Sequence, residues 1–172
     1  KGGWKTKSLI REITLSQTYR RSSRTNDPND PENRFLAAMN PKRLGYEAMR
    51  DCMLQASGEL ELKMGGPSQK LLQKPSGKRR AVYGYVDRQN IAPTLSTFDF
   101  ANPNIHAPKR VETTVPQQAL YALNDPFVIE RSKRLANLAR SEKEDEKLVR
   151  FLYRKTLSRD PTPQELATAL PF

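Results

Sequence analysis

The amino-acid sequence predicts a mainly α, irregular multi-helix domain with one small β-hairpin or ribbon and long loops. Most apolar residues recur at helical spacing, and a proline stands near the expected start of four helices, at Pro41, Pro116, Pro126 and Pro163. Residues 79–90 ("RRAVYGYVDRQN") instead show the alternation and aromatic content of a strand. These two patterns together indicate helices interrupted by one β element.

Two helices are expected in the first quarter of the chain. Residues 5–21 carry leucine and isoleucine at helical spacing, which predicts the first helix. Asp30 followed by Pro31 has the form of an N-cap and a first helical residue, and it predicts a short second helix through Phe35 and Met39.

A longer amphipathic helix is expected from Pro41 to Gly58, where the glycine ends it. Its apolar side is predicted to comprise Leu44, Ala48, Met49, Cys52, Met53 and Ala56. On this reading Cys52 is a small buried side chain rather than a reactive thiol.

The expected β element needs a partner strand, because a single strand leaves its backbone groups unpaired. Residues 60–64 alternate briefly and are the local candidate. We therefore predict a small ribbon formed by residues near 60–64 and 80–87, with Tyr83 and Tyr85 on one face.

The sequence of the second half of the chain predicts several helices separated by short connections. A helical turn follows Pro93, and two helices begin near Pro116 and Pro126. Residues 143–157 have the pattern of a further amphipathic helix. The string Thr-Pro-Gln-Glu, with Pro163 at the first helical position, is a capping box.

Charge and composition narrow the function classes. The net charge is +11, which favours an anionic partner such as an acidic protein domain or an acidic polysaccharide. Nucleic acid is not expected as a partner, because no zinc-finger, RNA-recognition or helix-turn-helix pattern accompanies the charge. The chain holds one cysteine, Cys52, and one histidine, His106. A disulfide, a Cys/His zinc site and a haem-c attachment motif within this chain are thereby excluded, and no transmembrane segment is predicted.

A candidate site is predicted from three polar and aromatic strings. The residues expected to converge there are Arg80, Tyr83, Asp87, Arg88, Asp99, Arg110 and Gln117. Amides, carboxylates and aromatic faces of this kind could orient a polyhydroxylated ligand. The alternative, which we prefer, is that the polar groups tie loops together, with Asp87, Asp99 and Asn102 in turns and Thr114 as an N-cap. Asp87 and Asp99 are too far apart in sequence to predict a catalytic carboxylate pair, so enzyme activity stays open.

Several strings occur in a characteristic order, among them "LIREITLSQTYRRSS", "DPENRFLAAMNPKRLGYEAMRD", "LQASGELELKMGGPS", "RRAVYGYVDRQ", "LSTFDFANPN", "RVETTVPQQALYALNDPFV" and "LYRKTLSRDPTPQEL". Together they resemble the planctomycete-specific C-terminal domain of unknown function (PSD type). That domain is found in large exported bacterial proteins that often also carry a haem-c domain. The resemblance covers nearly all 172 residues.

The resemblance implies that residues 1–172 form a single domain at the C-terminal end of a larger multidomain protein, with the N-terminal part of the family domain missing. It implies a periplasmic or cell-envelope location, haem c in another part of the protein, and a redox system tied to carbohydrate breakdown. No cofactor is expected in this chain. Three functions follow as hypotheses: a structural and interaction module, a contributor to an active site completed by other domains, or a basic module that binds an anionic polymer, either an acidic polysaccharide or a nucleic acid.

Overall fold

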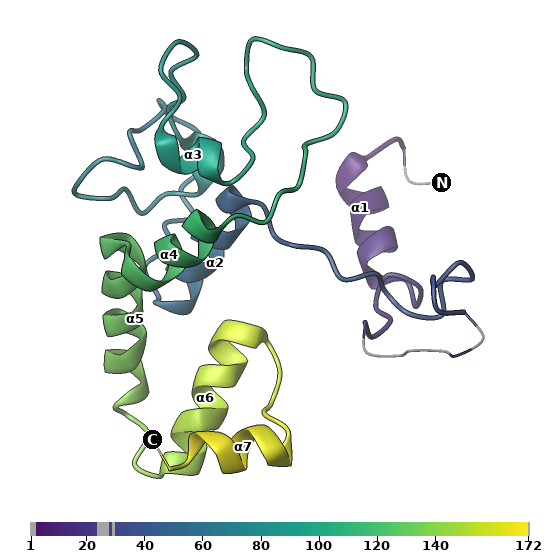
Figure 1. Cartoon of the computed structure of the whole chain (residues 1–172), viewed down its shortest axis with the longest axis vertical. Coiled ribbons are helices and arrows are strands. Elements are labelled where there is room, and N and C mark those ends of the chain that lie inside the picture. Colours follow the sequence, from purple (N-terminus) through teal and green to yellow (C-terminus); the bar gives the residue numbers. More distant parts are fainter. Residues whose placement is uncertain (1–2, 24–27, 29, 172) are drawn as a thin grey trace. The chain divides into compact units, whose positions relative to one another are not determined.

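The computed structural model describes residues 3–23, 28 and 30–171 (Figure 1). The chain divides into two compact units, Lys1–Arg43 and Leu44–Phe172, which are described in turn. The described residues are mainly helical, so the predicted fold class is confirmed.

The first unit contains one helix among its described residues, α1 (Thr6–Leu15). This confirms the helix predicted within residues 5–21. No residue of α1 is buried, and Leu9, Ile10 and Ile13 are each at least half exposed.

The short helix predicted after Asp30 is wrong: residues 31–39 form turns. The Asp30 carboxylate accepts hydrogen bonds from the backbone N–H groups of Arg34 and Phe35, at 2.7 and 2.8 Å. Asn33 and Leu36 both have φ of +52°, outside the right-handed helical region. The cap therefore closes a loop instead of starting a helix.

The second unit begins with α2 (Tyr46–Ala56), five residues later than the start predicted at Pro41. Gly45 is its N-cap, and a start at Pro41 would have placed this glycine inside the helix at a cost of about 1 kcal/mol. The helix ends as predicted at Gly58, whose φ is +73°, and the N–H of Glu59 bonds the carbonyl of Leu54 at 2.8 Å.

The predicted buried side of α2 is wrong except at Ala56, which is buried. The side chains that α2 buries include Tyr46, Arg50 and Leu54, spaced four residues apart, while Cys52 is exposed. A prediction based on the spacing of apolar residues places every arginine of α2 on the solvent side. Arg50 is nevertheless buried, because carbonyl groups of a neighbouring loop accept its N–H donors.

The predicted β ribbon does not form. The β pairing found among the described residues consists of two isolated parallel bridges, Glu61 with Arg79 and Gln69 with Gly84. Residues Ala81–Tyr83 instead form a 3-10 turn, η1. Side chains of α2 bond the Arg79 carbonyl and the Ala81 N–H, which are backbone groups that a strand ladder would have used.

Prolines start four of the remaining helices, as the sequence predicted. They are α3 (Pro93–Thr97), α4 (Pro116–Asn124), α5 (Pro126–Ala139) and α7 (Pro163–Ala169). The Asp125 side chain caps α5 by accepting from the N–H of Phe127 at 2.8 Å. The N-cap of α4 is Val115, so the prediction that Thr114 caps this helix is wrong.

Helix α6 (Asp145–Leu157) confirms the helix predicted over 143–157. Its first turn is acidic and its last turn is basic, which complements the helix dipole. The predicted capping box is present at the start of α7, where Thr162 and Glu165 bond each other's backbone N–H groups.

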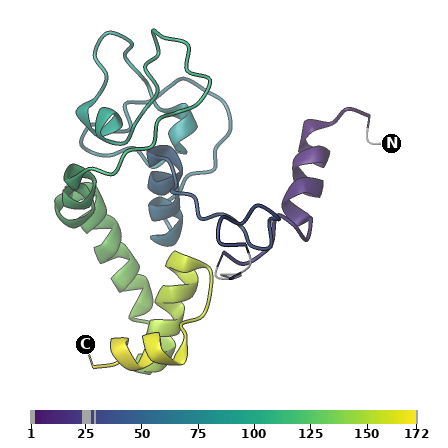
Figure 2. The same ribbon diagram turned by 45° about the vertical axis from the view of Figure 1, so that its right-hand side comes forward.

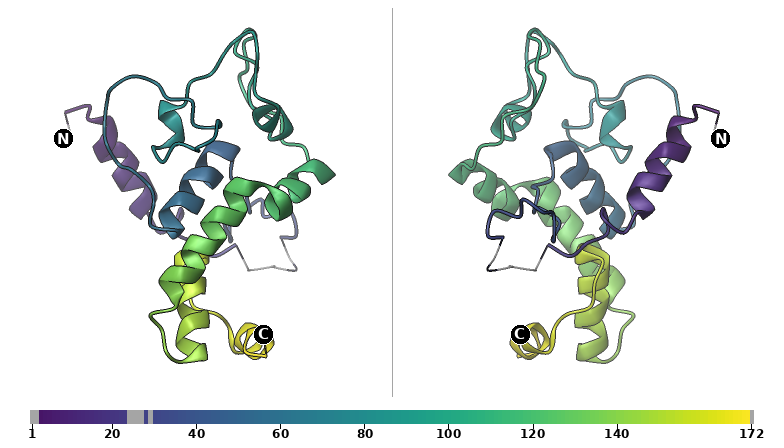
Figure 3. Two further views of the ribbon diagram at one scale, coloured as in Figure 1. Left: turned by 90° about the vertical axis from the view of Figure 1, so that its left-hand side faces the viewer. Right: turned by 90° about the vertical axis from the view of Figure 1, so that its right-hand side faces the viewer.

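Within the second unit, α2 contacts η1, α5 and α6. Helix α6 returns alongside α5, and α7 lies near the beginning of α6 (Figures 2 and 3). The buried apolar side chains are few for a unit of this size, and three arginines are buried with them: Arg50, Arg79 and Arg131. The guanidinium carbons of Arg50 and Arg131 lie 5.4 and 5.0 Å from the ring centre of Phe127, so the core is aromatic and cationic as well as apolar.

Candidate functional site

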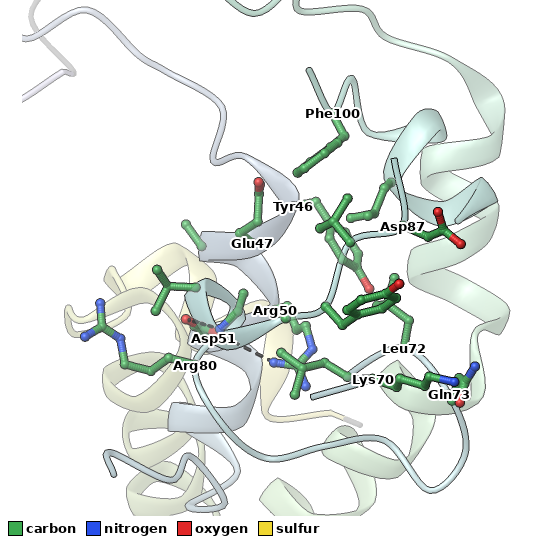
Figure 4. Close-up of a pocket in the computed structure, with 18 of the residues that line it drawn as sticks. Tyr46, Glu47, Arg50, Asp51, Lys70, Leu72, Gln73, Arg80, Asp87 and Phe100 are labelled. Atoms are coloured by element: carbon green, nitrogen blue, oxygen red, sulfur yellow. Dashed lines mark hydrogen bonds and ion pairs between the residues drawn. The ribbon is translucent and has the colours of Figure 1, made fainter. Parts of the chain in front are cut away.

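A cavity of about 790 Å³ opens beside the first turns of α2 (Figure 4). Its other walls come from the loop at residues 70–73, from residues 80–90, and from the α3 region. The lining residues include Tyr46, Glu47, Arg50, Asp51, Lys70, Leu71, Arg80, Tyr85, Asp87, Leu95 and Phe100.

Arg50 and Asp51 fix one wall of the cavity. Arg50 is 2% exposed; its Nη1 donates to the carbonyl of Arg79 at 2.9 Å, and its Nη2 donates to the carbonyl of Gly77. Both carboxylate oxygens of Asp51 accept from the N–H of Ala81, at 2.8 and 3.0 Å. Burial lowers the pKa of the Arg50 guanidinium from its ordinary value, yet an arginine remains charged at neutral pH.

Arg79 and Tyr83 hold the loop that precedes this wall. Arg79 is 3% exposed and donates to the carbonyls of Lys63 and Pro67, at 3.1 and 3.3 Å. Its guanidinium carbon lies 3.9 Å from the centre of the Tyr83 ring. The Tyr83 hydroxyl accepts from the N–H of Gly65 at 2.9 Å, so both side chains bond backbone groups of residues 63–67.

The cavity residue Tyr46 belongs to an aromatic cluster with Phe98 and Tyr121. The Tyr46 and Tyr121 hydroxyls lie 3.2 Å apart, and both rings contact Phe98 at centroid distances of 5.2 Å. Burial raises the pKa of both phenols above the ordinary value. Neither phenol is therefore ionised at neutral pH.

Arg110 comes to the edge of the cavity through Glu47. Two hydrogen bonds of 2.8 and 2.9 Å join the guanidinium to the carboxylate, and the guanidinium carbon lies 5.1 Å from the centre of the Phe100 ring. The bonds from Arg110 lower the pKa of Glu47, and the same bonds raise the pKa of Arg110. This pair closes the long loop after α3 onto α2.

Asp87 and Arg88 both make loop contacts. Asp87 Oδ1 accepts from the N–H of Gln89 at 2.9 Å, which is the predicted Asx turn. Arg88 donates to the carbonyl of Pro103 at 3.0 Å, and the Asn104 amide donates to the carbonyl of Arg88 at 3.1 Å.

Asp99 joins the two sides of the loop between α3 and α4. Its carboxylate accepts from the backbone N–H and the hydroxyl of Thr113, at 2.9 and 2.6 Å. This is a long-range tie rather than the predicted Asx turn, whereas Asn102 does form one with the N–H of Asn104. Gln117 lies apart from these contacts, in a separate hollow that also includes Phe98.

Of the seven residues predicted to converge, Arg80 and Asp87 line the cavity, and Arg110 touches its edge through Glu47. The other four lie in the loop contacts and the separate hollow described above: Tyr83, Arg88, Asp99 and Gln117. A ligand-binding role for the set stays a prediction.

The predicted set of seven omitted most of the cavity lining, including Tyr46, Arg50, Asp51 and Phe100. The spacing of Tyr46, Arg50 and Leu54 on successive helical turns was the available signal. It was overlooked because arginine does not count in an apolar stripe.

Within the described part of the chain, no group of three or more His, Cys, Asp and Glu side chains could hold a metal ion. No helix in the described ranges has both the length and the apolar character needed to cross a membrane.

Comparison with protein families matches residues 1–172 to the model described as PSD1, protein of unknown function (DUF1553). No curated protein and no solved structure matches the chain.

Proposed function

The chain belongs to the PSD1 family of proteins of unknown function (DUF1553), and on that premise we propose that it is a structural and interaction module of an exported multidomain protein. Its polar side chains hold long loops on a small helical frame, and its exposed cations meet an acidic partner.

The observation that carries the proposal is that the polar side chains hydrogen-bond backbone groups of other segments. Arg50, Arg79 and Arg88 donate to backbone carbonyls, while Asp51 and Asp99 accept from backbone N–H groups of distant segments. Side chains bound in this way build the shape of the module. They are poorly suited to acid or base chemistry, which needs a free lone pair or proton near the reacting atoms.

A basic segment, residues 63–80, supports the interaction role. Six cations and no acidic residue occur between Leu62 and Arg80. The structure buries Arg79 and pairs Lys78 with Glu59 at 3.1 Å. The other four are exposed: Lys63, Lys70, Lys74 and Arg80. Clustered exposed cations attract acidic surfaces and speed encounter with them.

The resemblance noted in the sequence supports the wider setting of this proposal. In that setting the module is exported to the periplasm or cell envelope, haem c is carried by another domain, and the whole protein takes part in a redox system linked to carbohydrate breakdown. The acidic partner is then a domain of the same chain, a companion protein or an acidic polysaccharide.

Zero-length carbodiimide crosslinking of the full-length protein tests the proposal, because it joins lysines only to carboxylates in direct contact. We expect Lys63 and Lys74 to crosslink to acidic residues outside residues 1–172. Lys133 on α5, which is also exposed, is the matched control and should not. Crosslinks confined to the module itself, for all three lysines, would overturn the proposal.

The cavity favours a second candidate, in which the module contributes part of an active site completed by other domains. Arg80 and Asp87 are the cavity residues that this role would use. Asp87→Asn in the full-length protein tests it, because the amide oxygen keeps the turn while the charge is lost. Loss of activity with an unchanged melting temperature would favour this candidate over the first.

A further inference from the structure

We propose that the cavity beside α2 binds a small monoanion, a molecule with a carboxylate on a largely apolar or aromatic body. This goes beyond the structural role, because it assigns the module a ligand of its own. It assigns Lys70 and Arg80 to the cavity and leaves Lys63 and Lys74 to the acidic partner.

The size and lining of the cavity suit a small organic molecule. Its volume of about 790 Å³ lies within the range of roughly 300–1,000 Å³ that is typical of ligand pockets. Leu71, Leu95 and Tyr46 are buried in its wall, at 4–7% exposure. Tyr85 and Val82 also line it, yet are 53% and 72% exposed, so they present apolar surface that a ligand could cover.

The wall is preformed. Arg50 bonds the carbonyls of Gly77 and Arg79, and Asp51 bonds the N–H of Ala81. These contacts hold the segment that carries Arg80 against α2. A pocket that is already shaped loses little conformational entropy when a ligand enters.

The charge balance of the lining selects the ligand's charge. The charge of Glu47 is balanced by its ion pair with Arg110. The charge of Asp51 is balanced by Arg50, whose Nη1 lies 3.4 Å from Asp51 Oδ1. The remaining charges are those of Lys70, Arg80 and Asp87.

Within the part of the chain that the structure describes, neither Lys70 nor Arg80 has a carboxylate partner. The Asp87 carboxylate accepts from the N–H of Gln89, and Figure 4 shows it on the opposite side of the view from Arg80. The lining therefore carries one uncompensated positive charge, which matches one carboxylate on the ligand.

Fluorescence titration of the full-length protein with 1-pyrenebutyrate tests this assignment, with the neutral 1-pyrenebutanol as the matched probe. We expect saturable binding of the acid and clearly weaker binding of the alcohol. Arg80→Gln and Lys70→Gln should each weaken binding of the acid about threefold to fivefold, and leave binding of the alcohol unchanged. Arg140→Gln and Lys133→Gln, at exposed positions on or just after α5, should change neither.

Two further variants separate charge from shape. Asp87→Asn should tighten binding of the acid about twofold or more, because it removes the opposing charge while keeping the turn. Ala48→Trp should block binding by filling the cavity, whereas Ala136→Trp, at an exposed position of α5, should not. Equal binding of acid and alcohol would overturn the monoanion assignment. Binding that survives Ala48→Trp would place the probe elsewhere and overturn the site.

Discussion

The Nη1 atom of Arg50 lies 2.9 Å from the carbonyl oxygen of Arg79, and this hydrogen bond joins the middle of α2 to a loop 29 residues further along the chain. The same guanidinium bonds the carbonyl of Gly77. One buried side chain thus replaces the cross-strand hydrogen bonds that would otherwise have ordered this loop.

Arg50→Met should destabilise the protein by about 3 kcal/mol, because the buried carbonyl of Arg79 and the partly buried carbonyl of Gly77 lose their donor. Urea unfolding followed by circular dichroism measures the change. Arg140→Met, at an exposed position after α5, is the control and should cost less than about 0.5 kcal/mol. An equal, small effect of both substitutions would show that Arg50 does not hold the loop.

Local signals in the sequence predicted most of the helices. Prolines at Pro116, Pro126 and Pro163, together with the capping box at Thr162, act within one helical turn, so their effect can be read without the tertiary structure. The predicted start of α2 was wrong: Pro41 favours a helix start, but a helix from Pro41 would contain Gly45, and the helix begins after this glycine.

The site could be predicted only in part, because its contacts span long distances in the chain. Arg110 meets Glu47 across 63 residues, and Asp99 meets Thr113 across 14. No periodicity encodes such pairs. Polar residue types in residues 79–118 correctly indicated loops tied by side chains, but they could not indicate which of them face the cavity beside Tyr46.

Asp99→Ala should destabilise the protein by about 1–3 kcal/mol. The loss has two sources: the hydrogen bonds to Thr113, and the left-handed backbone at φ of +58°, which aspartate tolerates better than alanine. Asp99→Asn keeps an acceptor for the N–H of Thr113 and should cost less. The melting temperature of the full-length protein checks both. An unchanged melting temperature with lost activity would instead place Asp99 in a functional site.

The phenols of Tyr46 and Tyr121 should make the protein alkali-sensitive. Their pKa values are raised in the folded state by burial, so the folded protein holds these protons more tightly than the unfolded chain does. Their contribution to stability is fully present below about pH 10 and is lost as pH rises above it. Absorbance titration should show two of the six tyrosines ionising at higher pH than an ordinary phenol, and Tyr121→Phe should leave one. Ionisation of all six near pH 10, with the helical signal intact, would contradict this.

Glu165 should lose its charge only in strong acid. The guanidinium of Arg159 bonds both carboxylate oxygens, at 2.6 and 2.7 Å, and the N–H of Thr162 bonds one of them at 2.8 Å. These bonds, chiefly those from Arg159, lower the pKa of Glu165 to about 2. Carbon-13 NMR of the Glu165 side-chain carboxyl should report this midpoint, and Arg159→Gln should move it upward.

A pKa lowered in the folded state stabilises the protein above the unfolded pKa of about 4.5, and this stabilisation is lost as pH falls toward 2. The melting temperatures of the wild type and of Glu165→Gln should therefore differ above pH 4.5 and converge near pH 2. Lys147→Gln is the matched control: it removes a cation of α6 that pairs with Glu144, and the Glu165 midpoint should not move. A Glu165 midpoint near 4.5 in the wild type would mean that the contact with Arg159 is not maintained in solution.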